Sequence, residues 1–136
     1  MNYLAIFVAS IIGMAVGMVW YSPAIFGKAW LKALGWSEKD LKQKKKGAKS
    51  MNVLMGTSFV CTLLTAYVLS TILNYWQTPS VMLGLQVGFW LWLSFTTAFA
   101  LPTYLFEQRS LKLFAINAGH QLVVTLVMAV VLAIWM

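Results

Sequence analysis

Long apolar runs separated by short polar stretches are the dominant pattern of this chain. An α-helix needs about 20 apolar residues to cross the hydrocarbon core of a bilayer. Helices are expected at such lengths, because each span must satisfy its own backbone hydrogen bonds in lipid. The predicted spans are residues 3–21, 51–73, 81–102 and 111–135. We therefore predict an all-α fold, an integral membrane four-helix bundle that forms one transmembrane domain over residues 1–136.

The segment between the first two spans, residues 23–50, has a different character. Pro23 disfavours helical backbone at the residue before it, so the first span should bend or stop there. Beyond it, apolar side chains fall on one helical side, whereas Lys28 and Lys32 fall on the other. This pattern predicts a short amphipathic helix that lies in the membrane interface. Gly35 is well placed to end that helix.

Lysine is concentrated in the same segment, which holds eight of the ten lysine and arginine residues. Arg109 and Lys112 flank the start of the fourth span, so with four spans both basic segments fall on one side. The positive-inside rule makes that side cytoplasmic. We therefore predict a multi-pass protein of the inner (plasma) membrane with both termini on the non-cytoplasmic side. Residues 37–49 are expected to form a solvated helix. The lysines expected to contact lipid headgroups are Lys28, Lys32, Lys44, Lys45 and Lys46.

The composition supports a membrane protein, because 61% of residues are hydrophobic and only 10% are charged, with a mean hydropathy of +0.79. Soluble domains are about a quarter charged. The net charge of +7 could suit nucleic acid, but no aromatic side chain is interleaved with the six lysines of residues 39–49, so no nucleic-acid partner is expected. The single cysteine, Cys61, lies in an apolar span and is interpreted as a small core residue.

Small residues at a spacing of four occur in three of the predicted spans. This spacing lets two helix backbones approach closely. The pairs expected to serve helix packing are Gly13 and Gly17, Gly84 and Gly88, and Ala115 and Gly119. Because three such faces are more than a single four-helix unit needs, we predict that the chain self-associates as a homo-oligomer.

The fourth span carries the densest group of polar side chains, and their spacings of three and four place them on one helical face. In hydrocarbon this face should turn toward protein partners. One interpretation is a network that only fixes helix packing. The other is a polar pocket near the cytoplasmic side, in which His120 binds a ligand or handles protons, since histidine titrates near neutral pH. The predicted pocket residues are Tyr21, Ser22, Glu107, Asn117, His120 and Gln121.

Motifs of known catalytic sites are absent from the sequence. It has no glycine-rich phosphate loop, no paired carboxylates and no H-E-x-x-H, so no catalytic residue is predicted. A metal site is not expected, because the chain has one histidine, one cysteine and no carboxylate within a span. No cofactor is predicted. The first span also lacks the embedded glutamate of small multidrug exporters, which argues against proton-coupled export of that type.

Four stretches resemble a known family: WYSP at 20–23, FGKAW at 26–30, FEQRS at 106–110 and KLFAINAGH at 112–120. Together they are similar to the bacterial membrane family called domain of unknown function 1761, over nearly the whole chain. The resemblance implies a small multi-span bacterial membrane protein with no assigned activity. At position 120 the family often has tyrosine, so the resemblance implies no role for the imidazole of this chain.

The favoured function is a homo-oligomeric binding or transport-like unit in the lipid bilayer, with a small-molecule ligand that the sequence does not identify. A structural or partner protein, in which the polar face only stabilises packing, stays open as an alternative. A small membrane enzyme that acts on a lipophilic substrate is the second alternative, and its turnover would depend on Glu107 or His120. An enzyme is the less favoured class, given the absence of catalytic motifs.

Overall fold

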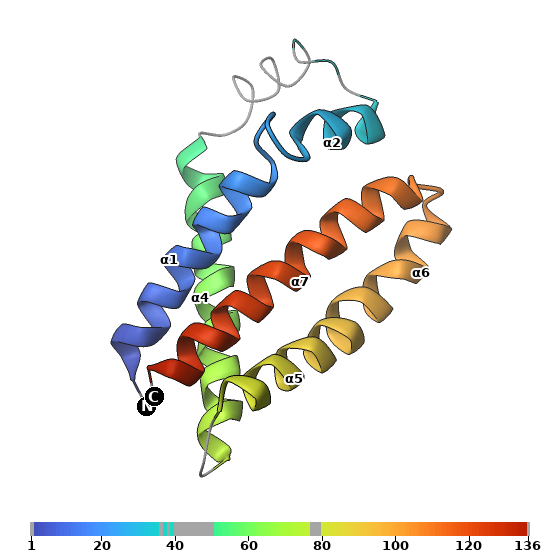
Figure 1. Ribbon diagram of the computed structural model, residues 1–136. Helices are drawn as coiled ribbons and strands as arrows, with labels where there is room; N and C mark the ends of the chain where they lie inside the picture. The colour runs from blue at the N-terminus through green and yellow to red at the C-terminus, as the bar shows by residue number, and fades with distance from the viewer. Residues whose placement is uncertain (1, 36, 38, 40–50, 77–79, 136) are drawn as a thin grey trace.

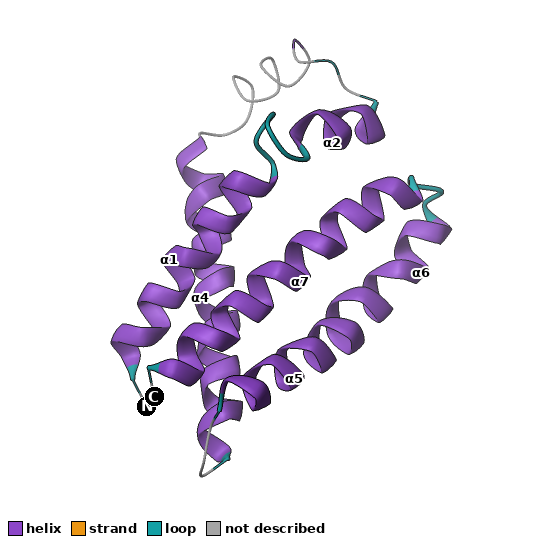
Figure 2. Cartoon of the chain, viewed as in Figure 1, coloured by secondary structure: helices purple, strands orange, loops and turns teal. Residues whose placement is uncertain are grey.

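The computed structural model describes residues 2–35, 37, 39, 51–76 and 80–135. In this part of the chain every regular element is helical, and no strand occurs (Figure 2). The elements are α1 (Tyr3–Trp20), α2 (Gly27–Leu34), α4 (Met51–Tyr75), α5 (Val81–Leu91), the π-helical η1 (Trp92–Thr97), α6 (Ala98–Phe106) and α7 (Leu111–Ile134). The expected all-helical class is confirmed, while the helix expected at 37–49 falls largely outside the described residues.

Four helical stretches of the described chain are long and apolar enough to cross a membrane. They are Tyr3–Trp20, Asn52–Tyr75, Val81–Phe106 and Leu111–Ile134. Their number and approximate positions agree with the four spans predicted from the sequence. The third stretch joins α5, η1 and α6 into one continuous helix.

This third helix continues past the predicted boundary at residue 102 and ends at Phe106. Pro102 has no backbone N–H to donate, so a normal helix loses one hydrogen bond at this point. Just before it the helix has π geometry, and the N–H of Ala98 donates to the carbonyl of Leu93, five residues back. Local π adjustment is one way in which apolar helices tolerate proline. The predicted boundary at residue 102 therefore placed the end of this helix too early.

Helix α7 is the element against which most of the others pack. It lies between α1 and α5, and α1 also packs on α4 (Figure 1). The buried core joins Ala9 of α1, Leu69 of α4 and Met128 of α7. All of its members come from the half of the molecule near the two termini, where the Asn2 amide donates to the Trp135 carbonyl at 3.0 Å. In the opposite half, buried side chains such as Tyr104, Leu113 and Ile116 lie outside this cluster.

Close approach within the chain accounts for five of the six residues of the small-residue pairs, whereas Ala115 is exposed. A Cβ at Gly13 would lie 3.2 Å from the sulfur of Met128, and one at Gly84 would lie 3.0 Å from the carbonyl oxygen of Ala129. At Gly119 the neighbour is the Trp20 ring, 3.1 Å away. Since the glycines of the pairs have close neighbours inside one chain, their spacing no longer argues for contacts between copies. Self-association itself stays a prediction.

The corner between α1 and α2 is tightly wound. Helix α1 ends at Trp20, and the Ser22 carbonyl accepts a 2.9 Å hydrogen bond from the Gly27 N–H. A Cβ at Gly27 would lie only 2.6 Å from the carbonyl oxygen of Tyr21, so only glycine fits there. Helix α2 ends at Gly35, whose φ of 76° is left-handed, as the sequence predicted. The corner brings Tyr21 back toward α7.

Candidate functional site

A chain of hydrogen bonds joins three helices near the α2 end of the molecule. The Tyr21 hydroxyl donates to the side-chain oxygen of Asn117 at 2.7 Å, and the Asn117 amide donates to the Tyr104 hydroxyl at 2.9 Å. The Arg109 guanidinium lies 4.4 Å from the centre of the Tyr104 ring, in a cation–π arrangement. The side chain of Asn117 thus has partners for both its oxygen and its nitrogen, and it ties the end of α1 to α6 and α7.

Tyr21 follows the last residue of α1 and donates the first hydrogen bond of this chain. Burial, and to a lesser extent the neighbouring Tyr104, raises the pKa of Tyr21 to about 12. Its hydroxyl is therefore protonated at neutral pH, which is the form that can donate to Asn117. The ring also packs edge-on to Trp30 of α2, with centroids 5.2 Å apart.

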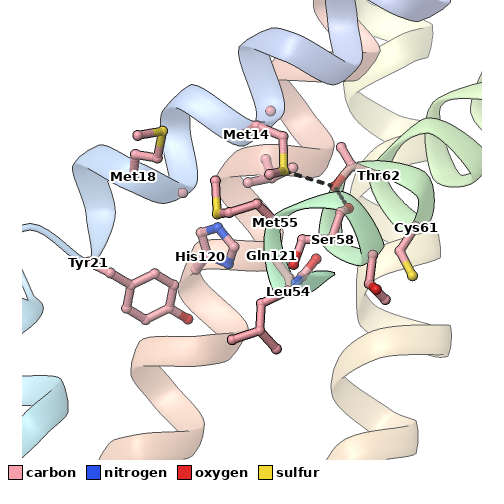
Figure 3. A pocket seen from close by; sticks show the side chains of 14 residues that line it. Met14, Met18, Tyr21, Leu54, Met55, Ser58, Cys61, Thr62, His120 and Gln121 are labelled. Carbon is pink, nitrogen blue, oxygen red and sulfur yellow. Dashed lines mark hydrogen bonds between the residues drawn. The ribbon is translucent and has the colours of Figure 1, made fainter. Parts of the chain in front are cut away.

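A cavity of about 560 Å³ lies between α1, α4 and α7, beside this hydrogen-bonded chain (Figure 3). Its α1 wall runs from Gly13 to Tyr21 and its α4 wall from Leu54 to Thr62. From Gly13 to Tyr21 the helix rises about 12 Å. The cavity is therefore shorter than half of a hydrocarbon core about 30 Å thick. The volume falls in the range of small-molecule sites.

His120 reaches into this cavity from α7. Its ring lies 4.9 Å from the Tyr21 ring, measured between centroids, and 6.4 Å from the Trp20 ring. A Cβ at Gly17 would lie 2.9 Å from the Nε2 atom of His120, so the absence of a side chain at position 17 is what admits the imidazole. Gln121 lines the same space. Within the described chain, no hydrogen bond joins either side chain to another protein group.

The α1 and α4 walls of the cavity are rich in sulfur and hydroxyl groups. Met14, Met18 and Met55 supply thioethers, and the Thr62 hydroxyl lies 3.7 Å from the Met14 sulfur (Figure 3). Thr62 also donates to the Ser58 carbonyl at 2.8 Å, one turn earlier in α4. No lysine, arginine, aspartate or glutamate is among the described residues that line the cavity.

The structure brings some of the predicted pocket residues together and separates others. Tyr21, His120 and Gln121 line the cavity, and Asn117 is bonded to Tyr21 just outside it. The Ser22 hydroxyl instead donates to the Val19 carbonyl at 2.7 Å, within its own turn. Glu107 forms an exposed ion pair with Arg109 at 3.7 Å. Lys28 and Lys32 are exposed on α2, while Lys44, Lys45 and Lys46 lie outside the described residues.

The predicted pocket residues included none from α4, and one other residue was assigned to the wrong environment. Cys61 is exposed and lines the cavity, so its assignment to the core was wrong. In a chain of apolar helices, an apolar neighbourhood in the sequence does not distinguish a protein core from a lipid-facing surface. The unusual number of hydroxyls in the second span was the available signal for the α4 wall.

A second cavity, of about 580 Å³, lies on another face of α4, against η1 and α7. Trp92 lines it and donates its indole N–H to the Ala118 carbonyl at 2.7 Å. Among the described residues, no group of three or more histidine, cysteine, aspartate or glutamate side chains could hold a metal ion. The site chemistry present is therefore that of uncharged polar groups and thioethers.

Fold and site together define a class: an all-helical protein with four helices of membrane-spanning length and a polar-lined cavity between three of them. The chain belongs to the family described as "Protein of unknown function (DUF1761)", whose model matches residues 4–133. This match confirms the family resemblance of the sequence motifs. Neither the curated proteins nor the solved structures contain a match to the chain. Family membership thus assigns no activity.

Proposed function

We propose that this protein crosses a membrane with four helices and binds a small molecule in the cavity between α1, α4 and α7, as a binding or transport-like unit. One observation carries the proposal. His120 and Gln121 both line the cavity, and within the described residues neither has a hydrogen-bonding protein partner. An unsatisfied polar group in hydrocarbon costs several kcal/mol. A bound molecule, or water held with it, supplies the missing partners.

The arrangement of charge supports an orientation in a bacterial inner membrane. Helix α2, with exposed Lys28 and Lys32, lies at the same end as the α6–α7 turn, with Arg109 (Figure 1). Under the positive-inside rule this end faces the cytoplasm, and both termini face the other side. Helix α2 then lies in the interface with its lysines among lipid headgroups. The cavity falls in the cytoplasmic half of the bilayer.

The two interpretations of the polar face of α7 apply to different residues. Asn117 has both partners within the protein, which supports a packing role for this side chain. His120 and Gln121 face the cavity, which supports a role in binding. The enzyme alternative is weaker, because Glu107 is paired with Arg109 and does not line the cavity.

Native mass spectrometry of the full-length protein, released from lipid nanodiscs, tests the proposal. We expect wild type to retain a small molecule and the double variant His120→Leu/Gln121→Leu to lose it. Gln86→Leu is the matched control, because Gln86 is exposed on α5 and does not line the cavity. No retained molecule in wild type, or equal retention in the double variant, would contradict the proposal. Crosslinking in lipid tests the predicted self-association separately.

A further inference from the structure

We infer that the occupant of the cavity is a neutral lipid with a carbonyl-bearing polar end, which enters sideways from the bilayer. This inference rests on the proposed function and names the class of ligand for the same site. Three features of the structure support it: the charge of the cavity, its free hydrogen-bonding groups and the exposure of one wall.

The charge of the cavity selects an uncharged ligand. Its described lining holds no acidic side chain and no lysine or arginine. Arg109, at the same end of the molecule, pairs with Glu107 at 3.7 Å and lies over the Tyr104 ring, not in the cavity lining. A charged ligand would therefore be held without a counter-charge in a medium of low dielectric constant, which is strongly unfavourable.

The polar groups are placed to bind one end of such a lipid. His120 lies next to Tyr21, and Gln121 follows it in the cavity lining; each can donate an N–H. A carbonyl oxygen has two lone pairs and can accept from both. The end of the cavity away from Tyr21 is bounded by Gly13 and Val124, close to the packed core. A lipid would thus lie with its carbonyl end toward the α2 end of the molecule and its apolar part toward the bilayer centre.

One wall of the cavity is open to the surroundings of the protein. Met18 is 66% exposed, Leu54 52% and Met55 39%, and all three line the cavity. Methionine is flexible and polarisable, so it adapts to apolar ligands of varied shape. Toward the termini, by contrast, α1 and α4 pack together through fully buried residues such as Ala9 and Ala66. Access is therefore lateral, between α1 and α4, from one half of the bilayer.

Photocrosslinking of the full-length protein in phosphatidylcholine nanodiscs tests this inference. Three photoactivatable probes are compared: a diacylglycerol, an isoprenoid quinone and an anionic phosphatidylglycerol. We expect at least one neutral probe to label peptides from 13–21 and 54–62, and excess unlabelled lipid of the same kind to compete. In His120→Leu/Gln121→Leu, labelling should fall about 25-fold, as expected when two hydrogen bonds worth roughly fivefold each are lost. Gln86→Leu should label like wild type.

The pattern of labelling distinguishes the sources of the lipid. Labelling by diacylglycerol alone identifies a glycerolipid, labelling by quinone alone identifies a quinone, and labelling by both supports the class as a whole. Equal labelling by phosphatidylglycerol, or labelling spread over all helices without competition, would overturn the inference. Ser58→Leu, at an exposed lining position, is the second variant should the double variant not fold, and it should also reduce labelling by filling the cavity.

The two proposals can fail separately. Retention of some molecule in native mass spectrometry, with no labelling by either neutral probe, would reject the neutral lipid and leave the binding function in place. Absence of both retention and labelling would reject both.

Discussion

Replacing Gly17 with alanine should impair the cavity without damaging the fold. The new Cβ would lie 2.9 Å from Nε2 of His120, about 0.6 Å closer than a comfortable contact of roughly 3.5 Å. The imidazole can yield, because within the described residues it is held by ring contacts and not by hydrogen bonds. Alanine also favours helix by up to about 1 kcal/mol over glycine. We therefore expect the free energy of unfolding to change by less than about 1 kcal/mol.

Ligand retention, in contrast, should fall by a measurable factor with the same change. Moving the imidazole weakens its hydrogen bond to the ligand, and one such bond is worth about 1 kcal/mol, or roughly fivefold in affinity. The assay pairs denaturant unfolding in detergent with native mass spectrometry of the retained molecule. Unchanged retention in Gly17→Ala would refute the placement of His120 in the ligand site.

Two further glycines provide matched comparisons for the same substitution. Gly56→Ala meets nothing within 4 Å, so it should leave retention unchanged and be neutral or slightly stabilising. Gly13→Ala meets Met128, Thr62 and Val124 at 3.2–3.3 Å from two other helices. This crowding should destabilise the protein by about 1–3 kcal/mol. Equal destabilisation by Gly17→Ala and Gly13→Ala would contradict the account of the cavity.

Three other predictions concern the surrounding structure. Between about pH 10 and about pH 12, wild type should lose stability relative to Tyr21→Phe. The pKa of Tyr21 is raised in the folded state, so the phenol stabilises the fold at pH values below the unfolded-state pKa of 10.0, and this stabilisation is lost as the pH rises through about 12. Thermal unfolding measured as a function of pH tests this. Trp92→Phe should destabilise by roughly 1 kcal/mol in denaturant titration, because the 2.7 Å bond to Ala118 is lost. Glu107→Gln should change the thermal midpoint little, since an exposed ion pair contributes about 0–1 kcal/mol, and a large drop would show that the carboxylate has another partner.

Periodicity and length predicted the helices well, because apolar spans leave few other solutions for the backbone. They could not predict that the helix would pass through Pro102, since this depends on π geometry created several residues earlier. They also could not separate protein-facing from lipid-facing positions, as the exposure of Cys61 shows. Hydropathy is nearly uniform around such helices, so the sequence does not distinguish the two surfaces.

The candidate site was partly predictable from the fourth span. The spacing of Asn117, His120 and Gln121 placed them near one another, and Tyr21 was among the predicted pocket residues. The spacing could not show that these three side chains have different environments. The Asn117 amide donates a hydrogen bond to Tyr104, whereas His120 and Gln121 face a cavity. That difference depends on where α6 and α4 lie, and this is a property of tertiary packing.

The single histidine of the chain permits the most direct test of the account. Solid-state NMR of protein labelled with ¹⁵N-histidine and ¹³C-glycine, in lipid bilayers, reports which groups lie near His120. We predict a short-range contact between its imidazole nitrogen and Gly17, and a change of the imidazole signals when a neutral lipid ligand is added. Contact of the imidazole with acyl chains alone, without a Gly17 signal, would contradict the central claim that His120 faces a binding cavity between α1, α4 and α7.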